Sequence, residues 1–285
     1  MALDLASGPA PTLTAAWLAA MLLAGSQSVQ FAVLIGLGLT GALIAGLVGI
    51  GGGIVMIPLL LYVPPSLGAP PLSIHVVSGI TMVQVMAAGI TGMLAHRRGG
   101  HLEPALVMTL GLATILASLA GGAASRFVSA EALTGIFASL AVVAVVLLLG
   151  GPRQRLVEEG AELQFSRAAA VALGAATGFL VGMVGAGGGF LLVPIMIYVL
   201  HVPVRVAVGT AMAIVALSAT AGTIGKAVTG QVDWLLALAL VCGALPGAYL
   251  GAVVSRRISA VALARLLAAV IGLIAVKMWW DILRW

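Results

Sequence analysis

Two glycine triplets, each followed by a proline, are the residues of this sequence best suited to bind a ligand through the backbone. The first lies in GIGGGIVMIP at residues 49–58 and the second in GAGGGFLLVP at residues 185–194, both inside long apolar runs. Glycine costs a helix interior roughly 1 kcal/mol relative to alanine, and proline about 3 kcal/mol. A helix that breaks there frees backbone N–H groups, which carry partial positive charge at a helix N-terminus. These residues therefore predict the binding of an anion by backbone amides.

The length of the first apolar run supports a break. A single helix over residues 31–63 would be roughly 50 Å long at about 1.5 Å per residue, well beyond a hydrocarbon core of about 30 Å. Pro58 is then expected near the start of a second, shorter helix, where a missing N–H costs least, and Pro194 likewise. Unpaired backbone survives in a membrane only where it is buried in protein or lines a cavity. Broken helices in an internal repeat are typical of a transporter's central site.

Close helix packing is the alternative explanation for the glycines, because small residues let helices approach each other. The sequence holds 38 glycines, and most of them are expected to serve packing alone. Packing requires neither a run of three glycines nor the following proline. We therefore favour the broken-helix site for the two repeated triplets.

The composition is that of a membrane protein. Of the 285 residues, 62% are hydrophobic and only 7% are charged, whereas an ordinary soluble domain is about 25% charged. The formal net charge of +5 is spread over short loops and builds no continuous basic face for a nucleic acid. The predicted fold class is all-α, a polytopic protein of the lipid bilayer, in a bacterial inner membrane. Eight apolar runs are recognised, near 31–63, 72–95, 104–123, 131–150, 168–200, 206–228, 234–254 and 260–282.

The eight runs form two repeats of four. The two glycine motifs align in register, and after six fewer residues in the second half the match continues, with His75 on Arg205 and Gly92 on Gly222. The predicted division of the chain is an N-terminal extension at 1–29, a first transmembrane repeat at 30–150, a charged linker at 151–167 and a second transmembrane repeat at 168–285.

Two topologies follow from the glycine-broken runs. If every run crosses once, the basic residues favour one side as cytoplasmic by eight to four. Those counted on that side are Arg97, Arg98, Arg153, Arg155, Arg167, Lys226, Lys277 and Arg284, and those on the other are Arg126, Arg205, Arg256 and Arg257. If a broken run instead turns back as a hairpin, the number of segments per repeat becomes odd and the repeats would be inverted.

The motifs resemble the TauE/SafE sulfite exporter family, also called the toluene-sulfonate uptake permeases. The resemblance rests on GLVGIGGGIVMIPLL, on its second copy FLVGMVGAGGGFLLVPIM and on the four-plus-four layout, and it covers residues 31–282. It implies an integral membrane transporter of sulfite, organosulfonates or related sulfur anions, bound at glycines of the two motifs. The implied site glycines are Gly51, Gly52, Gly53, Gly187, Gly188 and Gly189.

Polar side chains inside the runs add further candidates: Ser78, Thr81, Gln84, Thr210, Ser218, Thr220 and Thr223. Most intramembrane Ser and Thr residues bond their own helix backbone. Ser78 and Thr210 rank first because they lie nearest the matched starts of their helices, where hydroxyl donors would suit a sulfonate, and Thr81 follows. His75 and Arg205 could attract an anion at the membrane entry, although snorkelling interfacial charge is the commoner explanation.

The sequence offers no enzyme site. It contains no phosphate-binding Gly-Lys-Ser/Thr motif, no His/Glu metal constellation and no nucleophile with a plausible base, and Cys242 stands alone. No enzymatic activity, metal or other cofactor is therefore predicted. No Asp or Glu lies in the middle of a run, so the coupling mechanism stays open between a proton relay through His75, anion exchange and passive conduction.

The sequence thus predicts a secondary transporter, an exporter of a small sulfur-containing anion held between two glycine-broken helices. A channel-like anion pore and a membrane assembly or scaffold protein without transport are the alternatives. Oligomeric state is left open, with a homo-oligomer among the alternatives.

Overall fold

The computed structural model describes residues 13–48, 52–96, 103–150, 165–255 and 260–283. All regular elements in these ranges are helices, as the apolar composition predicts. In chain order they are α1 (Leu13–Val48), α2 (Gly53–Ser66), α3 (Ile74–His96), α4 (Pro104–Leu106), η2 (Val107–Gly111), α5 (Leu112–Ala124), η3 (Ser125–Phe127), α6 (Ala130–Gly150), α7 (Arg167–Val184), α8 (Gly189–Pro194), η4 (Ile195–Val199), α9 (Val204–Val228), α10 (Trp234–Ser255) and α11 (Ala260–Leu283).

Seven segments of the described residues are long and apolar enough to cross a membrane. They are Gln27–Ile44, Ile74–Thr91, Pro104–Phe127, Ala130–Leu147, Arg167–Val184, Val206–Val228 and Trp234–Gly251. The helix α2 and the segment Gly189–Val199 are apolar but shorter. Large apolar side chains such as Leu235 and Leu273 are about two-thirds exposed or more, as a lipid-facing surface requires. The chain is a multi-pass membrane protein.

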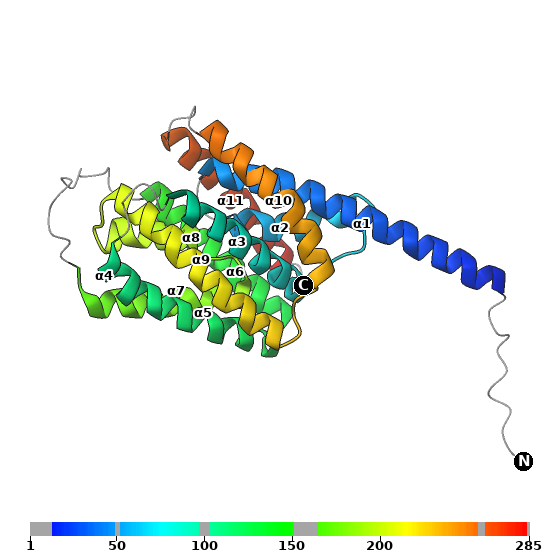
Figure 1. Cartoon of the computed structure of the whole chain (residues 1–285), viewed down its shortest axis with the longest axis horizontal. Coiled ribbons are helices and arrows are strands. Elements are labelled where there is room, and N and C mark those ends of the chain that lie inside the picture. The colour runs from blue at the N-terminus through cyan, green and yellow to red at the C-terminus, as the bar shows by residue number, and fades with distance from the viewer. Residues whose placement is uncertain (1–12, 49–51, 97–102, 151–164, 256–259, 284–285) are drawn as a thin grey trace, which may run out of the picture.

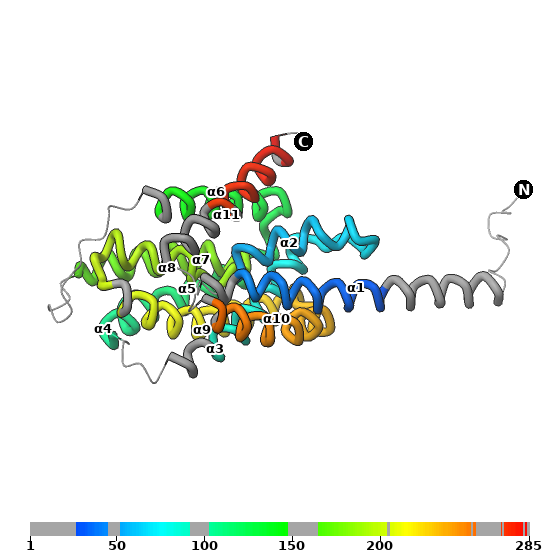
Figure 2. The backbone as a smooth tube through the Cα atoms, turned by 90° about the horizontal axis from the view of Figure 1, so that it is seen from above, coloured from blue at the N-terminus to red at the C-terminus, as the bar shows by residue number. Residues whose placement is uncertain are grey.

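The first predicted break is present between α1 and α2. The last described residue before α2, Gly52, has a left-handed φ of 77°, which favours glycine. Beyond the break the chain reverses, because Gly41 of α1 lies directly against Met56 and Leu59 of α2. Figure 2 shows α2 lying beside α1. The first apolar run is therefore a hairpin of one long and one short helix.

The second break separates α7 from α8 and uses three glycines. Gly185, Gly187 and Gly188 have φ values of 82°, 75° and 77°. After the break, Gly188 lies beside Val181 of α7. Met196 of the α8–η4 segment shares a buried apolar cluster with Ala170, near the start of α7. The topology in which every run crosses once therefore does not describe these two runs, and the hairpin alternative does.

The prolines lie deeper in the short helices than predicted. Pro58 is the sixth residue of α2 and Pro194 the sixth of α8, so both fall beyond the first turn. A proline there removes a helical hydrogen bond and crowds the preceding turn. In the second repeat the helix widens directly after Pro194 into the π-helical segment η4.

The two halves of the chain interlock. Helix α1 packs along α10, and α7, its counterpart in the second half, packs along α5 (Figure 1). Helices α3 and α9 are also counterparts, and they pack antiparallel, with Ser78 against Lys226 and Gly89 against Ala216. Two membrane-spanning counterparts that run antiparallel are related by an axis in the membrane plane, as in inverted repeats. This arrangement agrees with the hairpin alternative.

Close packing does account for other glycines. Three glycines of α7, spaced four residues apart, lie against backbone carbonyl groups of the segment from η2 to α5. The pairs are Gly174 with Leu110, Gly178 with Thr114, and Gly182 with Ser118. This is the spacing that lets two membrane helices approach closely.

The packing predicts that two Gly→Ala substitutions affect the stability of the protein differently. In Gly182→Ala the new Cβ would overlap the Ser118 carbonyl, and we expect a loss of about 1–3 kcal/mol in the free energy of unfolding. Gly135 of α6 has open space around its Cβ position, so Gly135→Ala should cost nothing. Thermal unfolding of the purified protein in detergent, followed by circular dichroism, would compare the two. Equal midpoints for both variants would contradict this packing.

Candidate functional site

The two breaks meet inside the protein. A Cβ atom at Gly53, the first residue of α2, would overlap the backbone of Ala186 in the second break, so these two backbones are in contact. The residues on both sides of this contact, 52–58 and 181–192, are buried without exception. The structure therefore brings the two glycine motifs to one place, as the broken-helix hypothesis requires.

Backbone amides at this meeting point precede the helical hydrogen bonds. In α2 the first bonds run from Val55 N and Met56 N to the carbonyl of Gly52. The amides of Gly53 and Ile54 come before these and have no acceptor within the helix. In the α8–η4 segment the first bonds likewise converge on one carbonyl, that of Gly188. Partial positive charge from both short helices is thus directed at the centre of the protein.

The second break runs along one face of α3. Gly185 lies against the carbonyl of Ser78, and Gly187 lies against the side chain of Val85, two helical turns further on. Neither position has room for a Cβ atom, so glycine is required there by space as well as by φ. Ser78 is fully buried and donates its hydroxyl to the His75 carbonyl at 2.9 Å.

Lys226 is the functional candidate that the sequence analysis missed. It was counted among loop residues that set topology, but it lies in α9 and is 0% exposed. Its Nζ donates to Ser78 Oγ at 3.0 Å, to Ser125 Oγ at 2.8 Å and to the Met183 carbonyl at 2.9 Å. All three acceptors are neutral. A buried ionisable side chain within a membrane-spanning helix is costly and marks a functional site by default.

The position of Lys226 in the repeat could have identified it. In the register that places Gly92 on Gly222, Lys226 falls on His96, so both repeats carry a basic residue there. Lys226 lies two residues from the end of its apolar run, 206–228, and was therefore grouped with the loop residues. In the structure, Met183 belongs to the last turn of α7, so Lys226 also neutralises the negative end of that helix beside the second break.

A hydrogen-bond network extends from Lys226 towards the loop after α9. Ser125 Oγ lies 2.7 Å from the Gly122 carbonyl and 2.8 Å from Gln231 Oε1. Gln231 Nε2 donates to Gly122 O at 3.0 Å and to Thr229 Oγ1 at 2.6 Å. The network fixes the end of α5 and the end of α9 around the lysine.

Three buried polar atoms close to this region have no hydrogen-bond partner. They are Thr81 Oγ1 and Gln84 Oε1 of α3 and Thr223 Oγ1 of α9. A buried polar atom without a partner costs free energy, and in a native structure it requires an explanation. Thr81 was among the residues predicted to bind substrate.

Four other residues predicted to bind the substrate either bond to other parts of the protein or fall outside the described part of the chain. Thr210 Oγ1 accepts a hydrogen bond from Glu103 N at 3.1 Å, at the end of α9 remote from Lys226. His75 Nε2 lies 3.0 Å from the Val128 carbonyl, near the start of α6. Gly51 and the side chain of Arg205 fall outside the described part of the chain.

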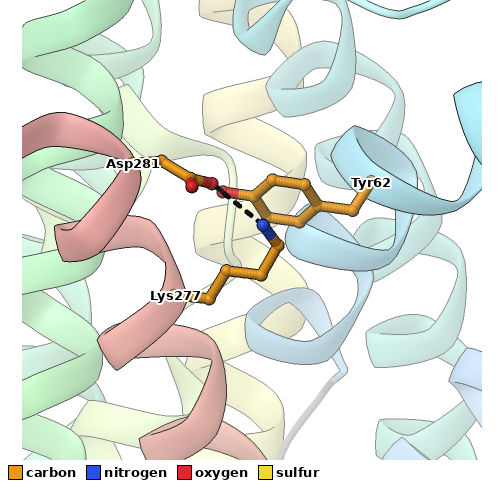
Figure 3. Close-up of polar contacts among 3 residues, drawn as sticks. All are labelled: Tyr62, Lys277 and Asp281. Carbon is orange, nitrogen blue, oxygen red and sulfur yellow. Dashed lines mark hydrogen bonds and ion pairs between the residues drawn. The ribbon is translucent and has the colours of Figure 1, made fainter. Parts of the chain in front are cut away.

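A polar cluster ties the first short helix to the C-terminal helix. Tyr62 of α2 donates its hydroxyl to Asp281 Oδ2 at 2.8 Å, and Lys277 Nζ lies 3.2 Å from the same oxygen (Figure 3). The Lys277 ammonium also sits 4.3 Å from the centre of the Tyr62 ring, a cation–π distance. These contacts attach the C-terminal half of α2 to α11.

Removing the tyrosine hydroxyl should weaken this attachment. We expect Tyr62→Phe to lower the free energy of unfolding by about 1–3 kcal/mol, because the lost bond has a charged acceptor. The matched control is Tyr198→Phe, at the equivalent position of the second repeat. Thermal unfolding in detergent measures both, and a midpoint for Tyr62→Phe equal to that of the control would contradict the attachment.

Comparison with known proteins agrees with this architecture. The family model described as "Sulfite exporter TauE/SafE" matches residues 33–278. The "Probable membrane transporter protein YunE" of Bacillus subtilis is 28% identical over 268 residues, which cover 88% of this chain and 98% of that protein. A second B. subtilis protein, "Probable membrane transporter protein YjnA", is 31% identical and covers 86% of this chain and 98% of its own length.

A "Probable membrane transporter protein" of Xylella fastidiosa strain 9a5c is 30% identical, covering 81% of this chain and 86% of its own length. No solved structure matches. The broken helices, the apolar spans and the match along most of the sequence lead to one conclusion: this chain belongs to the TauE/SafE sulfite exporter family of membrane transporters.

Proposed function

We propose that the protein is a secondary transporter that exports a small sulfur-containing anion, such as sulfite or an organosulfonate, and that it performs no enzymatic chemistry. The observation that carries the proposal is the contact between the two breaks, where Gly53 meets Ala186. The start of one short helix is thereby buried against the break that leads into the other. The description of the matching family supports sulfite or a related anion as the substrate.

An anion fits this position for electrostatic reasons. The N-termini of α2 and α8 supply partial positive charge, and the buried ammonium of Lys226 lies beside the second break. The surroundings are largely apolar, so these charges are weakly screened and a cation would be repelled. An oxyanion with several acceptor oxygens could bond more than one amide at once.

The interlocked repeats suggest how the site would open to either side. Helices α3 and α9 pack antiparallel at the centre, while α1–α10 and α7–α5 form two flanking pairs. In transporters built from inverted repeats, one unit rocks against the other around a fixed central site. We expect the flanking pairs to move relative to each other, alternately exposing the breaks.

A transport assay tests the proposal. Purified protein in proteoliposomes would be assayed for uptake and counterflow of radiolabelled sulfite and sulfoacetate. We expect saturable flux with counterflow, and a loss of about tenfold in Gly188→Ala. A Cβ at Gly188 has room, its nearest neighbour being Val181 Cγ1 at 3.4 Å, but φ is 77°. The cost is therefore backbone strain of about 1–2 kcal/mol, placed at the start of α8.

The matched control is Gly68→Ala. Gly68 has the same φ of 77° and open space around its Cβ position, but it lies in the loop after α2. The flux of the Gly68→Ala variant should therefore equal that of the wild type. Flux without saturation or counterflow would indicate a channel-like pore instead. If Gly188→Ala folds poorly but its folded molecules transport as fast as the wild type, the result would support the alternative that the glycines serve packing only. Absence of flux for both sulfur anions would refute the proposed substrate class.

A further inference from the structure

We infer that Lys226 and the polar side chains that line the α3–α9 interface beside it form the anion-binding site, with Lys226 as the counter-charge of a small oxyanion. This inference rests on the proposed function and assigns its substrate site to specific side chains. We call this set the α3–α9 seam: Ser78, Thr81 and Gln84 of α3, and Thr223 and Lys226 of α9.

The antiparallel register of α3 and α9 brings these side chains together. Ser78 Oγ accepts from Lys226 Nζ at 3.0 Å, and one turn further along α3 the side chain of Met82 lies against Gly222. The same register places Thr81 at the level of Thr223. Residues three apart lie on the same face of an α-helix. Thr81 therefore shares a face of α3 with Ser78, and Thr223 shares a face of α9 with Lys226.

The unpartnered hydroxyls of the seam point to a ligand that accepts hydrogen bonds. In the described part of the chain, the hydroxyls of Thr81 (0% exposed) and Thr223 (4%) have no hydrogen-bond partner, and neither has the amide oxygen of Gln84 (1%), which can only accept. By contrast, the buried hydroxyls of Thr114 and Ser118 are bonded, Thr114 Oγ1 to the Leu110 carbonyl at 2.7 Å and Ser118 Oγ to the Ser218 carbonyl at 2.9 Å. Threonine can donate its hydroxyl hydrogen to an acceptor, and an oxyanion is such an acceptor.

The charge of Lys226 determines that the seam binds an anion and not a cation. Lys226 bonds two serine hydroxyls and one backbone carbonyl, so its hydrogen bonds to described residues include no anionic group. A buried ammonium is stabilised most by an anion nearby, whereas a cation at the same oxygens would be repelled. A small oxyanion satisfies the threonine hydroxyls and the lysine together.

The seam is continuous with the second break. Ser78 and Val85 on α3 contact Gly185 and Gly187, and Thr81 lies between them on the same helical face. An anion bound at Thr81 and Thr223 would therefore lie beside the segment that leads into the first amides of α8. The backbone amides and the lysine then act on one ligand.

Binding measurements on the purified full-length protein test this inference. Affinities for sulfite and sulfoacetate would be measured by isothermal titration calorimetry in detergent, alongside thermal unfolding. We expect Lys226→Met to weaken binding by at least about tenfold, and Thr81→Val and Thr223→Val each by about threefold to tenfold. The two threonine variants should unfold at or above the wild-type temperature, because each removes an unpartnered buried hydroxyl.

The matched control is Thr114→Val, which removes a buried hydroxyl that is already bonded to the Leu110 carbonyl of η2 and should leave affinity unchanged. Should Lys226→Met fail to fold, the threonine variants decide the question. Loss of affinity without loss of stability supports the seam. Wild-type affinity in both threonine variants would overturn the seam while leaving the proposed function intact. A wild-type protein that binds neither anion would overturn the seam and the proposed substrate class together.

Discussion

The fold depends on one constraint: backbone groups that leave a helix inside a membrane need protein around them, because lipid offers no hydrogen bonds. This chain breaks two helices near its centre and buries both breaks against each other, at Gly53 and Ala186. The long helices surround them, and α3 and α9 pack against the buried segments. Much of the arrangement can be understood as the enclosure that two breaks in helical hydrogen bonding require.

Glycine serves this enclosure in two distinct ways. At Gly188 it permits a left-handed backbone at a buried position where a Cβ atom would still fit, whereas at Gly182 it removes a side chain so that α7 can touch α5. Gly185 and Gly187 do both at once, being left-handed and closely covered by α3. The two explanations considered for the glycine-rich sequence therefore apply to different residues, and at the second break they coincide.

The breaks and the all-helical membrane fold could be predicted, because apolar length and the Gly-Gly-Gly triplets leave few alternatives. The direction of the chain after each break could not be predicted, because a hairpin and a straight continuation have the same local sequence. Contacts such as that between Gly41 and Met56 determine the direction. Lys226 was overlooked because hydropathy places the end of an apolar run poorly. Thr210 was chosen for its place near a helix start and His75 for its charge at the membrane entry, but their hydrogen bonds lie at other contacts.

The antiparallel pairing of α3 with α9 makes the scaffold nearly symmetric, but its chemistry is not. Ser78 holds the ammonium of Lys226, whereas the position equivalent to Ser78 in the second repeat is Val208. A duplicated membrane unit that has diverged in this way presents different energetics to a solute arriving from either face. Directionality in such a protein can thus originate in unequal side chains on a nearly symmetric frame.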